Sequence, residues 1–517
     1  MNYYSFILIL LECTLIQKIQ SANILAFFPL PIYSHYSGFK ILFEELANRN
    51  HNVTVVSPFT PNDPMPSTYK YIPTSNVYTP NARKNIDHMK IRNMYRLFNM
   101  INVKLNMMKM VKHTLELNEI KLFLNDTKNE FDLVLIECWY NDVFLAIGER
   151  YSAPIICLSP MLPTAYQSSY LGVPINPAYI PSVWLYYSDK MSFKDRLNNF
   201  LMAIAELITN NILRINDQNM LEQLYEYPGH RNGSSLIDLK KNIALTFVNS
   251  HFSVSYSRPY PPNVIPVAGM HLRSELHENQ KEHKQLTHLL DKAVNGVIYF
   301  SFGSIIKMSN LSKNVVQIFI NCFKKLPQLV LWKWENGSID NLPQNIYTAK
   351  WFPQQYILNH KNCRLFITHG GYHSLVEAIH FGLPIIGFPF FVDQYYNTKY
   401  AEEKGFGIEI LIDTLNENIL LDALAKVLLQ PSYRINAEKM SKLISDFPKN
   451  TSLNTAVYWV EYVIRNGHGP HIYTEDLNWI QYLSIDIFIL LILIFVLLIF
   501  TIFSFFYLLK NYIKQNI

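Results

Sequence analysis

The sequence predicts two α/β domains followed by one membrane-spanning helix. Three observations lead to this prediction. Short apolar runs of the buried-strand type alternate with helix-length segments in both halves of the chain. The 517 residues exceed the size of a single hydrophobic core. An unbroken apolar run near the C-terminus is long enough to cross a bilayer.

The composition supports a large folded protein and gives no sign of a nucleic-acid partner. Hydrophobic residues make up 49 % of the chain and aromatic residues 14 %, which supplies ample apolar surface for two cores. The net charge of +5 is spread thinly over the whole length. A nucleic-acid-binding domain would instead concentrate its basic residues on one face or segment.

Residues 1–21 have the pattern of a secretory signal. An apolar core at Phe6–Leu11 is followed by the small residues Ser21 and Ala22, and we expect cleavage there. The alternative is a buried first strand or helix. The apolar run is too short to span a membrane.

Residues 22–255 are predicted to form the first α/β domain. Its first βαβ unit combines a strand at Ile24–Phe28, a helix with apolar residues on one face around Phe39–Leu46, and a strand at Val53–Val56. Similar strand-like runs follow at 133–136 and 155–158. The segment from about 160 to 245 is mostly helical and aromatic.

A second α/β domain is predicted for residues 285–440. Its apolar runs lie at 297–304, 329–332, 365–368 and 384–387, each separated by a helix-length segment. Residues 256–284, which begin near the proline-rich stretch Pro259–Pro262, are the linker candidate. Residues 441–486 are expected to form returning helices and a segment next to the membrane.

Residues 487–509 are predicted to span the membrane. This run carries no charge, and Lys510 and Lys514 follow it. By the positive-inside rule, the short tail 510–517 is cytosolic and the rest of the chain is luminal, which is a type I topology. Six glycosylation sequons are compatible with a luminal domain: they lie at Asn52, Asn125, Asn232, Asn310, Asn336 and Asn450.

The cysteines and carboxylates predict neither a disulfide framework nor a metal site. The five cysteines, Cys13, Cys138, Cys157, Cys322 and Cys363, are widely separated, and the first falls in the signal. No Asp-x-Asp pair occurs, and no His/Cys/Asp cluster has the spacing of metal ligands. We therefore expect no metal and no cofactor.

The most informative stretch of the second domain indicates an anion site. A predicted strand ends at Thr368, Gly370 and Gly371 allow the backbone to approach a ligand closely, and a helix is expected to begin near Ser374. Free backbone N–H groups and the positive end of the helix dipole would then face the turn. The alternative is that Ser374 and Glu377 form only a capping box.

This stretch resembles the signature of the UDP-glycosyltransferases. The similarity runs without a break from Trp351-Phe352-Pro353-Gln354 through His369-Gly370-Gly371 to Asp393-Gln394, and the general layout agrees over the full chain. The signal and the apolar tail are similar to those of the animal membrane-bound branch, of the insect type. The resemblance implies two Rossmann-like domains that face each other, the GT-B arrangement, with the nucleotide on the C-terminal domain.

The resemblance also implies the contacts of the UDP-sugar donor. Trp351 would stack on uracil, Gln354 would contact the nucleoside, and Glu377 would accept the ribose hydroxyls. The remaining expected donor-binding residues are His369, Gly371 and Ser374 at the diphosphate, Asp393 and Gln394 at the sugar hydroxyls, and Gly303 and Ser304 at the phosphates from the opposite loop.

The candidate base lies in the first domain. His35 follows the first strand, and a lone histidine in such a place is more often a surface or capping residue. The resemblance implies that it is the catalytic base, which needs a carboxylate to orient it. Both Glu137, at the end of a neighbouring strand, and Asp142, five residues later, are candidates, and we favour Asp142 because the family uses an aspartate.

The resemblance implies a transferase that moves a hexose, glucose rather than glucuronic acid, onto a hydroxyl of a small lipophilic acceptor, with inversion. The expected location is the endoplasmic reticulum membrane, and the sequence is compatible with a homo-oligomer. One alternative is a non-catalytic carrier or pseudoenzyme on the same fold. Another is a nicotinamide-dependent oxidoreductase, which the missing Gly-x-Gly-x-x-Gly turn disfavours.

Overall fold

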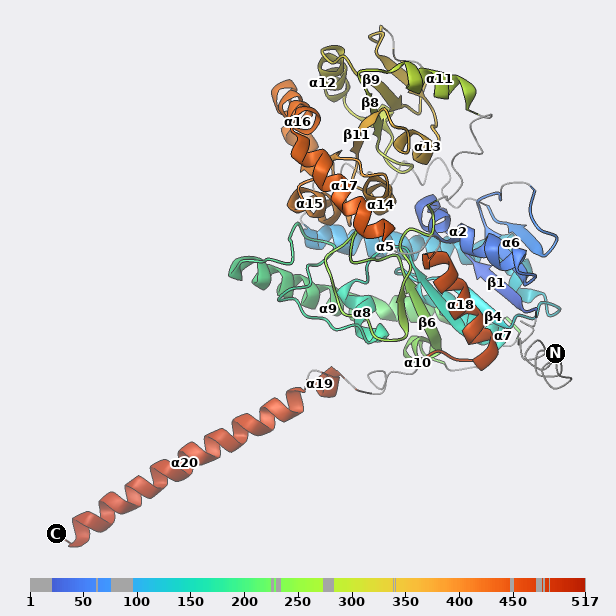
Figure 1. Cartoon of the computed structure of the whole chain (residues 1–517). Coiled ribbons are helices and arrows are strands. Elements are labelled where there is room, and N and C mark those ends of the chain that lie inside the picture. Colours follow the sequence, from blue (N-terminus) through green and yellow to red (C-terminus); the bar gives the residue numbers. More distant parts are fainter. Residues whose placement is uncertain are drawn as a thin grey trace, which may run out of the picture.

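Two parallel α/β domains and one long exposed helix make up the computed structural model (Figure 1). It describes residues 21–516 except 62–63, 76–95, 225–226, 229–233, 273–282, 338, 340, 447–450, 471–476, 478 and 483. The predicted signal, apart from Ser21, lies outside the described residues.

The first domain is built on a parallel sheet of seven strands in the order β3-β2-β1-β4-β5-β6-β7. The strands are β1 (Asn23–Phe27), β2 (Asn52–Ser57), β3 (Tyr69–Pro73), β4 (Leu133–Glu137), β5 (Ile155–Ser159), β6 (Ile243–Val248) and β7 (Val264–Pro266). The central strands are buried on both faces, which explains their continuous apolar runs. Phe27 of β1 pairs with Ile136 of β4, so the loops after these two strands meet at one edge of the sheet.

Helices cover the faces of this sheet. They are α2 (Tyr33–Asn48), α5 (Arg96–Glu116), α6 (Asn118–Asn125), η1 (Asp142–Leu145), α7 (Ala146–Tyr151), α8 (Ala165–Leu171), α9 (Phe193–Leu224) and α10 (Leu236–Lys241). Strand β7 lies inside the segment 256–284 that we expected to be a linker, so the first domain extends to at least Pro266. The prolines before β7 mark the turn into an edge strand, where proline is tolerated, rather than a linker between domains.

The second domain has a parallel sheet of six strands in the order β10-β9-β8-β11-β12-β13. The strands are β8 (Val297–Ser301), β9 (Leu329–Lys333), β10 (Ile346–Ala349), β11 (Cys363–Thr368), β12 (Ile385–Gly387) and β13 (Gly407–Glu409). The helices and 3₁₀ turns are α11 (Lys284–Lys292), η3 (Met308–Asn310), α12 (Lys313–Lys324), α13 (Gln354–Leu358), α14 (Tyr372–His380), α15 (Gln394–Glu403), η4 (Ile412–Thr414), α16 (Glu417–Leu429) and α17 (Pro431–Ser445).

The chain then returns to the first domain before it continues into the long C-terminal helix. Helix α18 (Thr451–Asn466) packs on α2, and its Val457 and Val460 join the apolar cluster on that side of the first sheet. After the short α19 (Trp479–Tyr482), α20 (Ile485–Asn516) projects away from both domains (Figure 1). Helix α20 is the one candidate membrane span among the described residues, and the apolar window within it is fully exposed.

Candidate active site

A cleft of about 2950 Å³ lies between the two domains and gathers most of the predicted site residues. It is lined from the first domain by His35 and its neighbours, and from the second domain by the ends of β8, β11 and the following helices. All ten predicted donor-binding residues line it: Gly303, Ser304, Trp351, Gln354, His369, Gly371, Ser374, Glu377, Asp393 and Gln394. Glu137 and Asp142 are not among the lining residues.

His35 lies in the first turn of α2 and is held by Glu137. Its Nδ1 is 2.5 Å from Oε1 of Glu137, the last residue of β4, and both side chains are buried. The contact forms because β1 and β4 are neighbours, so the residues that follow β1 face the end of β4. Trp139 packs against the imidazole in a T-shaped arrangement, with the ring centroids 5.4 Å apart. With Nδ1 bonded to the carboxylate, Nε2 is the nitrogen left to accept a proton.

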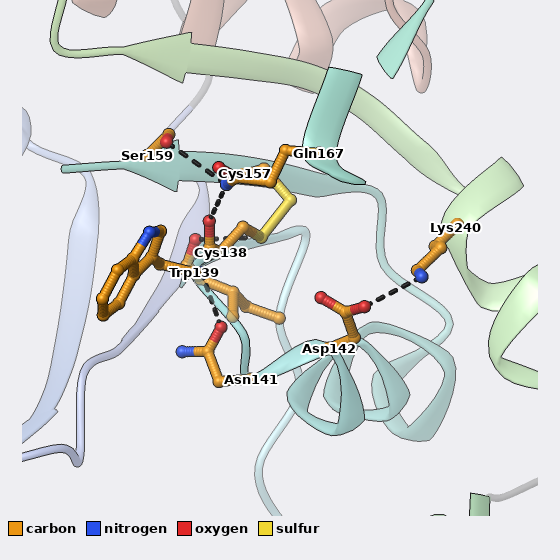
Figure 2. The surroundings of a disulfide bond; sticks show 9 residues. Cys138, Trp139, Asn141, Asp142, Cys157, Ser159, Gln167 and Lys240 are labelled. Carbon is orange, nitrogen blue, oxygen red and sulfur yellow. Dashed lines mark hydrogen bonds and ion pairs between the residues drawn. A yellow bond between two sulfur atoms is a disulfide. The ribbon is translucent and has the colours of Figure 1, made fainter. Parts of the chain in front are cut away.

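Our preference for Asp142 as the partner of His35 is wrong. Asp142 is buried at the start of η1, where its carboxylate lies 2.8 Å from Nζ of Lys240 and accepts a bond of 2.5 Å from the Tyr166 hydroxyl. Figure 2 shows the ion pair between its carboxylate and Lys240. Burial acts to raise the pKa of Asp142, but Lys240 and Lys104 outweigh it and hold this pKa below its usual range. Asp142 is thus the charged partner of a buried lysine.

A disulfide that the sequence did not predict fixes the loop after β4. Cys138 follows β4, Cys157 lies in the adjacent strand β5, and their sulfurs are bonded (Figure 2). The two cysteines are far apart in sequence but lie on neighbouring strands, which is why spacing alone did not reveal the bridge. Gln167 Nε2 donates to the carbonyl oxygen of Cys138 over 2.6 Å. The bridge therefore anchors the chain between Glu137 and Trp139, two residues that contact His35.

The helix that follows the glycine turn of the second domain begins earlier than the sequence predicts. Helix α14 starts at Tyr372, with Gly371 as its N-cap and no side-chain capping bond, so Ser374 is not a capping residue. Leu375 N–H donates to the carbonyl oxygen of Gly371 over 3.0 Å. The N–H groups before Leu375 consequently have no acceptor within the helix and are available to an anion in the cleft.

His369 is enclosed by two glycines and is neutral. A Cβ atom at Gly371 would lie 2.5 Å from its Nε2, and one at Gly303 would lie 2.7 Å from its Cε1. Both loops can approach the imidazole only because these residues are glycines. Burial, helped by the nearby ammonium of Lys333, lowers the pKa of His369 to about 4. This histidine can donate a hydrogen bond to a ligand but brings no charge.

Lys333 supplies a positive charge that the sequence interpretation missed. It ends β9, beside the strand that leads to Gly303, and it lines the cleft while remaining buried. Its Nζ donates to the carbonyl oxygen of Gly303 over 3.0 Å and lies 2.8 Å from Oε1 of Glu335. It is also 5.5 Å from the ring centroid of Trp351. The sequence signal that could have revealed Lys333 is its position as a charged residue at the end of an otherwise apolar strand.

Glu377 and two glutamines form a polar cluster beside the start of α14. Glu377 accepts hydrogen bonds from the side chain of Gln354 and, over 2.9 Å, from Nε2 of Gln355. Burial raises the pKa of Glu377 to about 7, against the opposing effect of these two bonds. The carboxyl group is therefore easier to protonate than an exposed glutamate. Trp351, which precedes this cluster, is 62 % exposed, so its indole face is open to a planar ligand.

The Asp393 loop is tied to the glycine turn. Asn397 Nδ2 donates to the carbonyl oxygen of Gly370 over 2.9 Å and to Oδ2 of Asp393 over 2.8 Å. Gln394 accepts from the Phe390 N–H over 2.8 Å, which leaves its amide nitrogen to donate. Burial raises the pKa of Asp393 to about 6. Asp393 and the glycine turn thus form one rigid wall of the cleft.

The two domains touch at His373, the second residue of α14. A Cβ on Gly38 of α2 would lie 3.0 Å from Nε2 of His373, and His373 stacks on His271 with ring centroids 4.2 Å apart. Burial, followed by the effects of His271 and His35, holds the pKa of His373 well below its usual range. Packing of neutral imidazoles is therefore one of the contacts between the two sides of the cleft.

Within the described parts of the chain, no group of three or more His, Cys, Asp or Glu side chains is placed to hold a metal ion. The positive features of this wall of the cleft are the α14 N–H groups and Lys333.

Known proteins with the same fold and sequence pattern identify the family. The family model described as "UDP-glucoronosyl and UDP-glucosyl transferase" matches residues 26–516. The chain is 34 % identical over 470 residues to UDP-glycosyltransferase UGT4 of Dactylopius coccus, covering 90 % of each protein. It is 33 % identical to UDP-glucosyltransferase 2 of the same insect, covering 94 % of this chain and 92 % of the relative.

Solved structures give the same fold at low identity. The glycosyltransferase of kitacinnamycin superposes with a TM-score of 0.57 at 15 % identity, covering 86 % of this chain and 100 % of the other. This likeness shows that the two sheets form a GT-B fold. The family model and the insect relatives show more: the chain belongs to the UDP-glucuronosyl and UDP-glucosyl transferase family and is a hexosyltransferase.

Proposed function

We propose that this enzyme transfers glucose from UDP-glucose to a hydroxyl of a small lipophilic acceptor, with inversion at the anomeric carbon. One observation carries the proposal. His35, which is paired with Glu137 behind it, and the N-terminus of α14 belong to different domains and face the same cleft. A base on one wall and an anion site on the opposite wall suit an in-line displacement between them.

In the proposed reaction, Nε2 of His35 takes the proton of the acceptor hydroxyl as its oxygen attacks C1 of the sugar. Glu137 holds the imidazole through Nδ1 and stabilises the imidazolium that forms. The new C1–O bond forms as the bond from C1 to the phosphate oxygen breaks, and its electron pair leaves with UDP. Attack from the wall opposite the diphosphate inverts the configuration.

The charge that develops on UDP is proposed to be stabilised by the second domain. The free N–H groups at the start of α14 and the ammonium of Lys333 both lie in the cleft wall. His369 would add a neutral hydrogen bond. Trp351 would stack on uracil and Glu377 would accept the ribose hydroxyls, while Asp393 and Gln394 would bind the sugar.

Two observations bear on the substrates. Glucose is proposed ahead of glucuronic acid because a relative at 33 % identity is named a UDP-glucosyltransferase. A lipophilic acceptor is proposed because Met107, Met110, Trp139 and Met161 line the cleft on the side of the first domain. Methionine and tryptophan surfaces fit apolar molecules of varied shape.

We also propose that the two domains lie in the lumen of the endoplasmic reticulum, anchored by α20 in a type I orientation. Lys510 and Lys514 follow the apolar part of α20. The sequons at Asn52, Asn125, Asn310 and Asn336 are exposed, and those at Asn232 and Asn450 lie outside the described residues. In intact microsomes the domains should resist protease, and glycosidase should lower the apparent mass. A protease-sensitive, unglycosylated chain would contradict this topology.

The test of the reaction is a screen of UDP-sugars against phenols, flavonoids and steroids with the full-length enzyme in membranes. We expect turnover with UDP-glucose, a product of inverted configuration, and near-complete loss of rate in His35→Ala with UDP binding retained. A protein that binds UDP and a lipophilic ligand but transfers no sugar would favour the non-catalytic carrier instead. A His35→Ala enzyme of near-normal rate would remove His35 as the base.

A further inference from the structure

Helix α15 of the second domain is contacted by several segments of the first domain. It begins at Gln394, with Asp393 just before it, so its N-terminus is the edge of the cleft that is proposed to bind the sugar. Tyr395 and Tyr396, the next two residues, are buried. The position of this sugar-binding edge therefore depends on the contacts that cover α15.

The contact nearest to the sugar-binding edge comes from Arg96, the first residue of α5. Its guanidinium carbon lies 3.5 Å from the ring centroid of Tyr395, which is only 5 % exposed. A guanidinium over a buried aromatic face is a cation–π contact of the stronger kind, because little water screens it. Tyr395 directly follows Gln394, whose Oε1 accepts from the N–H groups of Phe390 and Phe391 over 2.8 and 3.2 Å. Arg96 thus covers the residue next to the proposed sugar ligands.

Two further contacts hold the rest of α15. The Tyr186 hydroxyl donates to Oε2 of Glu402 over 2.8 Å, and Nζ of Lys399 lies 4.8 Å from the Tyr186 ring centroid. The Tyr256 N–H donates to the Tyr396 hydroxyl over 3.2 Å. Tyr186 and Tyr256 both belong to loops of the first domain. The first domain therefore contacts α15 along its length, and Arg96 is the contact at its N-terminal end.

Helix α5, which begins with Arg96, also forms part of the acceptor side of the cleft. Met107 and Met110 of this helix line the cleft. Met107 lies about 16 Å further along the helix axis than Arg96. Lys104, on the same helix, is buried and pairs with Asp217 of α9 over 2.7 Å, so α5 is fixed within the first domain. One rigid helix thus connects the acceptor side of the cleft with the residue that follows Gln394.

We infer that Arg96 is a positioning residue, which fixes the acceptor side of the cleft relative to the sugar-binding edge through its contact with Tyr395. The inference rests on the transfer reaction proposed above. Transfer requires the acceptor oxygen to lie within reach of C1, and a displacement of about 1 Å can lower the rate strongly. Arg96 itself does not line the cleft, so it acts through Tyr395 and not by touching a substrate.

Loss of this contact has a consequence that general destabilisation would not have. The donor would remain bound by the second domain, while the acceptor would be aligned with C1 in a smaller fraction of the molecules. Water would then compete for the same carbon: its oxygen attacks C1, its proton passes to His35, and UDP leaves. The ratio of free glucose to glucoside should therefore rise, whereas a partly unfolded enzyme would lose both products equally.

The test uses full-length enzyme in membranes with UDP-glucose and a phenolic acceptor. Arg96→Met should lower kcat for glucoside formation by about 10-fold, the usual size of a desolvated cation–π contact, and should raise the ratio of glucose to glucoside. UDP affinity, measured by calorimetric titration, should stay within about twofold. Tyr395→Leu should reproduce the loss, and the double variant should lose no more than either single variant. Tyr395→Phe, which keeps the ring face, should retain most of kcat.

Lys404→Met is the matched control. Lys404 lies 5.3 Å from the ring centroid of Tyr400 at the other end of α15, and both residues belong to the second domain. This variant should change neither kcat nor the product ratio. Additive losses in the double variant of Arg96 and Tyr395, or an unchanged product ratio in Arg96→Met, would overturn the inference.

A measurement that needs no turnover separates this inference from the proposed reaction. Hydrogen exchange of the UDP-bound enzyme should become faster in Arg96→Met at both residues 96–107 and residues 394–403, and should not change there in Lys404→Met. Unchanged exchange in Arg96→Met would overturn the inference even if the wild-type enzyme transfers glucose. A wild-type enzyme that forms neither glucoside nor glucose would refute the proposed reaction, and the exchange rates would then show whether Arg96 fixes the two elements.

Discussion

The two walls of the cleft differ in how their residues are distributed along the chain. The proposed donor wall comes mostly from one continuous stretch, residues 351–394, which folds into the strands β11 and β12, the glycine turn and the helices beside them. The acceptor wall is assembled from α2, the loop after β4 and residues of α5, which are far apart in sequence. A continuous motif fixes its own local geometry, whereas a dispersed wall depends on how strands pair. The predictions below test this difference, beginning with the largest expected effect.

Glu137→Gln should lower kcat by roughly 10³-fold or more, because a neutral amide cannot stabilise the imidazolium of His35. Donor affinity should change little, since Glu137 does not line the cleft. Rapid-quench kinetics and UDP titration measure the two quantities. Asp142→Asn is the control: it should keep most of kcat but lower the free energy of unfolding by about 3 kcal/mol, because Lys240 loses its buried partner. The reverse pattern would restore Asp142 as the orienting acid.

Lys333→Met should weaken UDP binding by about 10- to 100-fold, the usual contribution of a hydrogen bond to a charged group. Calorimetric titration of UDP measures the loss, and uridine should bind nearly as before because it has no phosphate. Lys325→Met, which removes an exposed lysine paired with Glu417 in the same domain, should have no effect. Equal losses for UDP and uridine would mean that Lys333 shapes the site without meeting the diphosphate.

Uridine affinity should fall as the pH falls through about 7, the pKa to which burial raises Glu377. Protonation removes the carboxylate charge that accepts the ribose hydroxyls, so affinity should drop by up to about tenfold per pH unit below this value. Uridine avoids the titration of the phosphate itself. Glu377→Gln should abolish the dependence. Glu409→Gln should preserve it, although burial raises the pKa of Glu409 to about 7 as well, because Glu409 does not line the cleft.

Exhaustive chelation should have the smallest effect, leaving the transfer rate unchanged. The α14 N–H groups and Lys333 already present positive charge to the diphosphate region. Rates before and after EDTA treatment, and after addition of Mg²⁺ or Mn²⁺, test this expectation. Activity that disappears on chelation and returns with a divalent cation would show that the donor wall is incomplete without a metal.

All ten residues predicted to contact the donor line the cleft, and the structure differs from the sequence prediction there in two local respects. The helix after the glycine turn begins at Tyr372 instead of near Ser374, because Gly371 serves as the N-cap. Lys333 was missed because it comes from β9, outside the motif, and reaches the site only through the pairing of β8 with β9. The sequence shows which residue types the motif contains. It does not show that the positive charge of this wall comes from Lys333.

The acceptor wall was harder to predict. The sequence predicted His35 as the base and favoured Asp142 over Glu137 as its partner, although these two carboxylates are only five residues apart. The end of β4 points Glu137 toward α2, while the next turn directs Asp142 toward Lys240. The Cys138–Cys157 bridge was missed for the same reason, since it depends on the adjacency of β4 and β5.

The sequence by itself determined the alternation of strands and helices, the family signature and the apolar C-terminal run, because each is a local pattern in neighbouring residues. Only the tertiary structure decided the partner of His35, the position of Lys333 in the cleft wall and the disulfide. Each of these depends on which elements pack together. Contacts between residues distant in sequence are set by strand order and domain packing, and no local pattern of residues records them.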